Sequence, residues 1–480
     1  MLCESTTIYF TSFVQFCWCD LNKIKMGGST MRKLKGFSFL LLCLVMVLTA
    51  CGGGKSPANA TPTPTPTPVE ETTPTPTPEP EETYDLGGRV IKIAAWWDLT
   101  PLGETQSDIN RLEKIKAVEE KYNVKIEFVN VPFEEMVANF TNSVLSGEPF
   151  ADIVQLEYKA ALPLIKQGLI QPISEFTDSA SNINNEGNLL TKYSPIAGDY
   201  YGFDNPTSIG AGMHYNRAIF EQLGLPDPKE LYANGEWTWD KFLEIAKLAT
   251  KDTNNDGKND VFGFAGWSLD VYKHFAVSNG VRIADEENLV EGLSSAGSIE
   301  TGEFLNQLYN VDKVVKVSTG DPMDWNESNT FKDGDVAMFT VAEWNLGGLT
   351  FDFGIVPIPK GPSQTTDYTY ANTAASAKFI GKGVQDAKLV YQIYEETFDI
   401  PMLEDYPGQD YLEGMYGFED DVDMLRNHIA GTGLITLDDA FPEFPTWAFV
   451  NDVVVNKVSA SAAAETHKGP AEAAVLKLGN

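Results

Sequence analysis

The loop at residues 252–260 has the residue types and the spacing of a calcium site. Its sequence is Asp-Thr-Asn-Asn-Asp-Gly-Lys-Asn-Asp, with oxygen-bearing side chains at positions 1, 3, 5 and 9 and glycine at position 6, as in an EF-hand. Gly263 stands where the bidentate glutamate belongs, so affinity should suffer unless a distant acid completes the shell. The alternative is a polar turn between a helix and a strand. We favour a structural calcium, with Asp252, Asn254, Asp256, Lys258 and Asp260 as the predicted ligands.

Cys51 ends a segment with the pattern of a bacterial lipoprotein signal. Residues 32–35 carry three basic side chains, residues 37–48 form an apolar run, and Leu-Thr-Ala precedes the cysteine. The apolar run is too short to span a bilayer as a stable helix, which favours a cleaved targeting peptide. The ending resembles the lipobox, in which the cysteine thiol is acylated. We therefore expect Cys51 to be a palmitate-type lipid anchor, the alternative being a membrane helix followed by an ordinary cysteine.

The segments around this signal have separate interpretations. Residues 1–30 precede the basic start and are interpreted as an extension from a wrong start codon, and residues 31–50 as the signal peptide. Residues 51–84 contain Thr-Pro repeats and acidic side chains, which favour an extended polyproline II tether. No cysteine follows Cys51, so the mature chain has no disulfides and depends on its core.

Composition narrows the classes of ligand. The chain of 480 residues has 43% hydrophobic residues, enough for a core in more than one domain, and a formal net charge of -33. Such a charge repels nucleic acid and anionic lipid head groups. The sequence therefore favours a neutral or cationic ligand and predicts no nucleic-acid partner.

The first folded part alternates between strand and helix patterns. Strands are predicted at 90–95, 124–128 and 152–156, with amphipathic helices at 109–122 and 133–146 between them. This order predicts a parallel sheet, in which ligands lie beyond the carboxyl ends of the strands. The expected positions are Trp96, Trp97 and Asp98 after the first strand and Glu157, Tyr158 and Lys159 after the third. Because the two tryptophans are adjacent, one is expected to pack and the other to face the ligand.

Further along, a series of motifs resembles family 1 extracellular solute-binding proteins of bacterial ABC importers, which include maltose-binding protein. The resemblance runs from about Val90 to the end of the chain, in the same order as in the family. It rests on Tyr201-Gly202, His214-Tyr215-Asn216-Arg217, Gly224-Leu225-Pro226, Thr238-Trp239-Asp240, Phe331-Lys332-Asp333-Gly334-Asp335-Val336-Ala337-Met338 and Gly354-Ile355-Val356-Pro357-Ile358-Pro359-Lys360-Gly361.

The resemblance implies a two-lobed α/β fold of the type II periplasmic-binding-protein class, with strands that cross between the lobes. Lobe one would comprise residues 85–207 and 372–405, and lobe two residues 208–371 and 406–480. Gly210 and Gly212 lie near the first crossing. Their torsional freedom would serve a hinge, and close backbone packing is the alternative.

The resemblance also implies where a sugar would bind. Trp267, Trp325, Trp344 and Trp447 fall at family positions whose aromatic rings contact the ligand, and stacking of such rings suits the apolar face of a sugar. The acid that some relatives carry in the first crossing is replaced near residues 207–209. The predicted ligand residues are Trp97, Asp98, Tyr158, Asn205, Trp267, Asn279, Trp325, Trp344 and Trp447.

The implied function is a receptor for an oligosaccharide. We expect a monomer, held by its lipid on the extracytoplasmic face of the cell membrane, that delivers its sugar to ABC permease subunits served by a separate ATPase. We expect neither catalysis nor a required cofactor, since the chain has no HExxH, GxSxG, P-loop or dinucleotide motif. The alternatives are a secreted polysaccharide-degrading enzyme and an importer receptor for a polyamine or peptide.

Overall fold

The computed structural model describes residues 84–177, 183, 199–204, 210–285, 288–398, 400, 403, 405–406, 408–441 and 443–479. The predictions for the signal peptide, the Cys51 anchor, the tether and Asn205 fall outside these residues. Within them, no helix combines the length and the apolarity needed to cross a bilayer.

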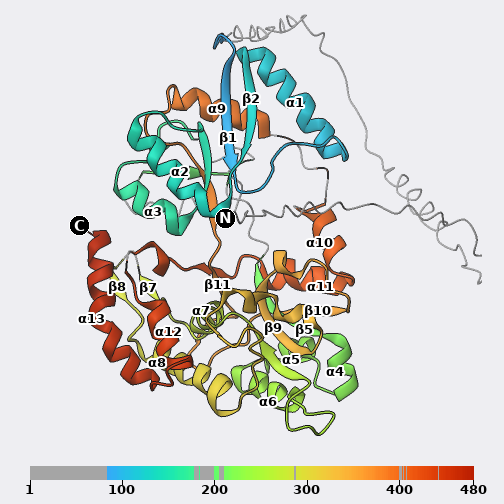
Figure 1. Ribbon diagram of the computed structural model, residues 1–480. Coiled ribbons are helices and arrows are strands. Elements are labelled where there is room, and N and C mark those ends of the chain that lie inside the picture. Colours follow the sequence, from blue (N-terminus) through green and yellow to red (C-terminus); the bar gives the residue numbers. More distant parts are fainter. Residues whose placement is uncertain are drawn as a thin grey trace, which may run out of the picture. The chain divides into compact units, whose positions relative to one another are not determined.

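Lobe one is built on a five-stranded sheet with helices on both faces (Figure 1). β1 pairs in parallel with β2 and β3, whereas β12 runs antiparallel between β3 and β4. The sheet therefore receives a strand from a distant part of the chain. Its elements are β1 (Arg89–Ala95), α1 (Gln106–Tyr122), β2 (Val124–Asn130), α2 (Phe133–Ser146), β3 (Ile153–Glu157), α3 (Tyr158–Lys166), β4 (Gly202–Phe203), β12 (Ser376–Phe379) and α9 (Ala387–Phe398).

Local sequence explains the ends of these elements. Thr105 caps α1 by accepting from the backbone of Asp108, and Asn123 ends the same helix at φ 48°. Gly147 ends α2 at φ 82°, a backbone conformation that glycine adopts without strain. The predicted strand and helix order in this lobe is confirmed.

Lobe two contains a four-stranded sheet in the order β10-β5-β9-β6. Side chains alternate between its faces: Met213 and Met338 join a core with the helices α6 and α7, and Phe339 and Ile355 join a second core with α10 and α11. The two-lobed α/β prediction is confirmed. The sheet and these helices are β5 (Ala211–Asn216), α6 (Trp239–Ala249), β6 (Phe262–Ala265), α7 (Ser268–Ser278), β9 (Val336–Ala342), β10 (Phe353–Val356), α10 (Gln409–Met415) and α11 (Glu419–Met424).

Shorter elements surround this sheet. Thr238 accepts from the backbone N–H of Lys241 at the start of α6, and Trp239 is buried. The remaining elements are α4 (Arg217–Leu223), α5 (Pro228–Ala233), β7 (Ala284–Asp285), β8 (Val290–Glu291), α8 (Ala296–Asn306), the π-helix η3 (Gln307–Val311), the 3-10 helices η4 (Trp325–Asp333), η5 (Glu343–Leu346) and η7 (Asp438–Ala440), β11 (Tyr370–Asn372), the π-helix η6 (Leu425–Ile429), β13 (Gly433–Ile435), α12 (Thr446–Val454) and α13 (Ala460–Gly479).

The two glycines near the first crossing have different physical roles. Gly210 has φ 101°, which a residue with a Cβ atom adopts only with strain. Gly212 lies inside β5, and a Cβ atom there would come within 2.8 Å of the Ile355 side chain and of the Val356 carbonyl oxygen. Close packing therefore accounts for Gly212, and backbone conformation accounts for Gly210.

The segment around η7 joins the core of lobe one rather than that of lobe two. Leu437, Ala440 and Phe441 belong to the same hydrophobic cluster as β1, β3 and α3. The predicted boundaries assign these residues to lobe two.

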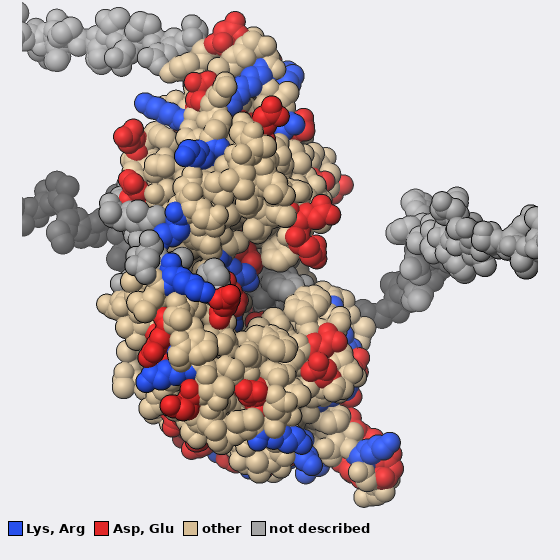
Figure 2. Space-filling view, turned by 60° about the vertical axis from the view of Figure 1, so that its left-hand side comes forward, with Lys and Arg blue, Asp and Glu red and all other residues tan. Residues whose placement is uncertain are grey.

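Charged side chains of both signs are interspersed over the face shown in Figure 2, and they do not gather into a basic stripe there.

Candidate functional site

The carboxyl ends of β1 and β3 bring the predicted strand-end residues of lobe one together. β1 and β3 are paired in parallel, Ile93 with Ile153, so the segments that follow them leave the sheet at the same edge. Trp96 is half-buried and packs edge-to-face on Phe133 of α2, with ring centroids 5.4 Å apart. Trp97 is 38% exposed, and the Nζ of Lys378 lies 5.9 Å from its ring centroid. Of the two adjacent tryptophans, Trp96 is therefore the one that packs.

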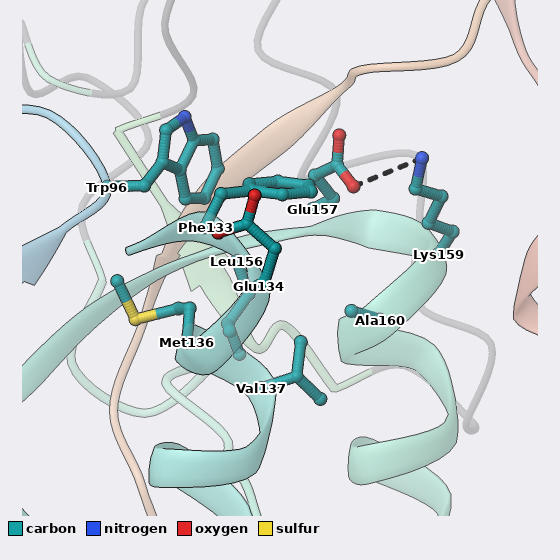
Figure 3. A pocket seen from close by; sticks show the side chains of 9 residues that line it. All are labelled: Trp96, Phe133, Glu134, Met136, Val137, Leu156, Glu157, Lys159 and Ala160. Carbon is teal, nitrogen blue, oxygen red and sulfur yellow. Dashed lines mark ion pairs between the residues drawn. The ribbon is translucent and has the colours of Figure 1, made fainter. Parts of the chain in front are cut away.

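A cavity of about 270 Å³ opens beside Trp96 at this edge (Figure 3). This volume lies near the lower end of the range for small-molecule sites. The wall formed by α2 is apolar apart from Glu134, and the wall is polar where α3 begins. The lining residues are Trp96, Phe133, Glu134, Met136, Val137, Leu156, Glu157, Lys159 and Ala160.

The polar side of the cavity is an ion pair. The Nζ of Lys159 lies 3.1 Å from Oε2 of Glu157, as drawn in Figure 3, and it also donates to the Thr373 carbonyl at 3.4 Å. The Glu157 side chain is only 11% exposed, and burial, partly offset by Lys159, raises the pKa of its carboxyl. A carboxylate and an ammonium group beside two aromatic rings can hydrogen-bond the hydroxyls of a neutral polar ligand.

Two predicted residues of lobe one lie differently from this group. Asp98 is exposed, and its carboxylate accepts from the Thr100 backbone N–H at 2.9 Å, which lowers the pKa of Asp98 through the hydrogen bonding of Thr100. Tyr158 is buried and packs edge-to-face on Phe379 in the core. We therefore keep Asp98 as a rim residue and leave Tyr158 out of the candidate site.

In lobe two, Trp267 follows the carboxyl end of β6. Its indole Nε1–H donates to the Met323 carbonyl at 3.0 Å, which fixes the half-buried ring at the start of α7. Trp325 begins η4 two residues after that carbonyl and is 49% exposed. The structure thus places these two predicted residues near each other at one corner of lobe two.

The other predicted residues of lobe two are separate from this corner. The backbone of Trp344 lies in η5, directly after β9, and Trp447 is 53% exposed in the first turn of α12. Asn279 is buried at the end of α7, where its amide donates to the Gly297 carbonyl and accepts from the Ser363 backbone. Its hydrogen bonds are used within the lobe, so we leave Asn279 out of the candidate site.

Phe133 and the rest of the α2 wall were not predicted as site residues. The signal is present in the sequence, because α2 begins directly after β2 and therefore at the same edge of the sheet. Phe133 is the first residue of that helix and is 48% exposed. Large exposed apolar residues at a strand edge mark a candidate ligand surface.

The loop at 252–260 is closed by its own hydrogen bonds. Asp252 accepts from the backbone of Asp256 and Gly257, while the carboxylate of Asp260 accepts from Thr253 and Asn254. Among the described residues, no three His, Cys, Asp or Glu side chains gather closely enough to hold a metal ion. Calcium binding by Asp252, Asn254, Asp256, Lys258 and Asp260 stays a prediction.

Comparison with known proteins assigns the chain to a protein family. Residues 110–383 match the family described as bacterial extracellular solute-binding protein. No curated protein matches the chain.

Among solved structures, the chain is similar to an ABC substrate-binding protein of Listeria monocytogenes in complex with cycloalternan. The identity is 14%, the TM-score is 0.57, and the match covers 82% of this chain and 99% of that one. The Thermus thermophilus maltotriose-binding protein bound with maltotriose is 16% identical, with a TM-score of 0.57, and the match covers 80% of this chain and 100% of that one. UgpB of Mycobacterium tuberculosis in complex with glycerophosphocholine is 16% identical, with a TM-score of 0.59, and the match covers 82% of this chain and 100% of that one. These likenesses show the fold, which is that of the type II class.

Proposed function

Because the chain belongs to the bacterial extracellular solute-binding protein family, we propose that it captures an oligosaccharide between its two lobes and delivers it to an ABC permease. The observation that carries this proposal is the cavity beside Trp96, where two aromatic rings adjoin the ion pair of Glu157 and Lys159. Lobe two would contribute the exposed rings of Trp325 and Trp447.

Physical chemistry favours a saccharide at such a site. A sugar presents an apolar C–H face and a rim of hydroxyls, and an aromatic ring covers the face while a carboxylate and an ammonium group hydrogen-bond the rim. The net charge of -33 does not penalise a neutral ligand. The cycloalternan and maltotriose bound by two structural neighbours support this class, and the glycerophosphocholine bound by a third makes a non-sugar solute the principal competitor.

The cellular setting is part of the proposal. Cys51 would carry the lipid that holds the protein on the extracytoplasmic face, and the Thr-Pro tether would separate the lobes from the membrane. The ligand would stabilise a closed arrangement of the lobes by its higher affinity for that state, and the permease would recognise the closed form. The ATPase would be a separate subunit.

A thermal-shift screen tests the ligand class. The mature protein would be heated with xylo-, manno-, gluco- and arabino-oligosaccharides, a polyamine and a short peptide. A bound ligand at 100 times its Kd stabilises the fold by about 2.7 kcal/mol, which raises the melting temperature. We expect the largest rise with one of the saccharides. The largest rise with the polyamine or the peptide would contradict the proposal in favour of a non-sugar receptor.

A second assay separates binding from hydrolysis. The same oligosaccharides would be incubated with the protein and assayed for new reducing ends. A receptor returns the glycan intact, whereas a polysaccharide-degrading enzyme produces reducing ends in proportion to time.

Small-angle scattering on the same samples should show a smaller radius of gyration with the bound saccharide. An unchanged radius for every saccharide would contradict closure.

A further inference from the structure

A buried lysine connects α7 of lobe two with η7, the short helix that joins the core of lobe one. Lys273 lies in α7, a helix whose residues are buried apart from Asp270, and it is itself only 2% exposed. Its Nζ lies 2.7 Å from Oδ2 of Asp439 and 3.1 Å from Oδ2 of Asp438, both in η7. A lysine is almost never fully buried unless it is paired. Burial alone would lower the pKa of Lys273, but the two aspartates outweigh it and raise this pKa, so the ammonium stays charged.

Asp438 also contacts the start of α12. Its Oδ2 accepts from the hydroxyl of Thr446 at 2.7 Å, and Thr446 is the first residue of the helix. Pro445, which precedes it, offers no side-chain cap. A carboxylate at a helix N-terminus is favoured by the helix dipole and by the free backbone N–H groups. Asp438 therefore stabilises and orients the first turn of α12.

This first turn carries Trp447, which is 53% exposed. Two residues further along, Phe449 is buried and packs on Tyr272, the neighbour of Lys273, with ring centroids 5.3 Å apart. This apolar contact holds the body of α12 on α7. The first turn of α12 is held instead by the ion pair of Lys273 with Asp438 and the hydrogen bond of Asp438 with Thr446.

We propose that Lys273 is a positioning residue for Trp447: its ion pair with Asp438 sets the first turn of α12 and thereby the direction in which the exposed indole ring meets the solute. The role of the ring in binding rests on the proposed function. The setting of the ring by Lys273 does not, and it can be tested without a ligand.

An apolar residue at position 273 could not take this role. Oδ1 of Asp438 is buried and has no hydrogen-bond partner among the described residues, so the carboxylate depends on Lys273 for charge compensation. Removing one partner of a buried ion pair leaves an uncompensated charge, which must move toward water or take up a proton. Either change alters the acceptor that Thr446 uses.

The test uses 19F NMR of the mature protein made with 5-fluorotryptophan, with the Trp447 resonance assigned by Trp447→Phe. Thr446→Val has nearly the same shape and removes only the hydroxyl that Asp438 accepts from. We expect Thr446→Val and Lys273→Met to shift the Trp447 resonance by more than its linewidth and to leave that of Trp325 in place. Lys273→Arg keeps the positive charge, so the Trp447 resonance of this variant should lie closer to its position in the unaltered protein than that of Lys273→Met.

The matched control is Thr397→Val in α9, where an equally buried hydroxyl donates to the Ile393 carbonyl. It should leave the Trp447 resonance unchanged. A Trp447 resonance that stays in place in folded Thr446→Val overturns the proposal, even if Lys273→Met does not fold. Failure of the proposed function would instead appear as the absence of any saccharide-induced thermal shift in the unaltered protein.

Discussion

The two lobes prepare their candidate binding surfaces in different ways. In lobe one, Trp96 is half-buried, Glu157 is 11% exposed and paired with Lys159, and a cavity lies beside them. In lobe two, Trp325 and Trp447 present rings that are about half exposed. A preorganised polar pair confers specificity, whereas exposed rings add contact area with less geometric demand. We therefore expect lobe one to select the proposed saccharide and lobe two to add affinity for it.

The largest effect is expected from Glu157→Ala. A hydrogen bond to a charged group contributes about 1.5–3 kcal/mol, so Kd for the best saccharide of the screen should rise about 10- to 150-fold by calorimetry. The variant also leaves Lys159 without its carboxylate partner. Glu134→Ala is the control, because Glu134 lines the same cavity as an exposed acid without an ion pair to Lys159. Equal losses in the two variants would contradict a special role for Glu157.

Trp447→Ala and Trp325→Ala should each have a smaller effect. An aromatic contact contributes about 0.5–1.5 kcal/mol beyond the area it buries, which corresponds to a 2- to 10-fold rise in Kd. Tyr411, exposed on α10, provides the control variant Tyr411→Ala. Should either tryptophan variant weaken binding more than Glu157→Ala does, the assignment of selection to lobe one would be reversed.

The pH dependence of the free energy of unfolding tests the pKa of Asp270 in α7. Asp270 is partly buried at the start of α7, and this partial burial raises the pKa of its carboxyl to about 6 from an unfolded value of 3.8, despite the nearby positive charges of Lys273 and Lys159. Between pH 4 and 6 the folded state binds more protons at this group than the unfolded state, so its contribution to stability falls as pH rises. The melting temperature of Asp270→Asn relative to the unaltered protein should therefore be higher at pH 7 than at pH 4. A constant difference across this range would contradict the raised pKa of Asp270.

Calcium at the 252–260 loop should have the smallest effect. Weak extracellular sites have Kd near 10⁻⁴–10⁻³ M, so 1 mM calcium would stabilise the fold by about 1 kcal/mol. The measurement is the melting temperature with calcium and with a chelator, with Asp252→Asn as the control that should abolish the difference. Equal melting temperatures with calcium and with chelator would leave the loop as a hydrogen-bonded turn.

The strands and helices of lobe one could be predicted because their signals are local. Apolar periodicity predicted β1, α1, β2, α2 and β3, and the last residues of the helices follow from Asn123 and Gly147. The edge position of Trp96 and Trp97 followed from the strand order alone. Trp325 and Trp447 are about half exposed, and their use as ligand contacts stays a prediction.

The other features depend on contacts between residues far apart in the sequence. The burial of Tyr158 results from β12, which contributes Phe379 from more than 200 positions away. The pairing of Lys273 with Asp438 likewise joins two helices that no local pattern connects. Side-chain direction at a strand end is set by such partners, so residue type and spacing located the edge but did not say which side chains face outward.

The insertion of β12 between β3 and β4 has a consequence for synthesis. When residues 84–204 have left the ribosome, β3 exposes an unpaired edge, because its neighbour is supplied by residues 376–379. The sheet of lobe two, residues 211–356, is complete earlier in the chain. The nascent polypeptide must therefore keep an open β-edge protected while about 170 further residues are translated, and we expect termination soon after residue 204 to favour aggregation.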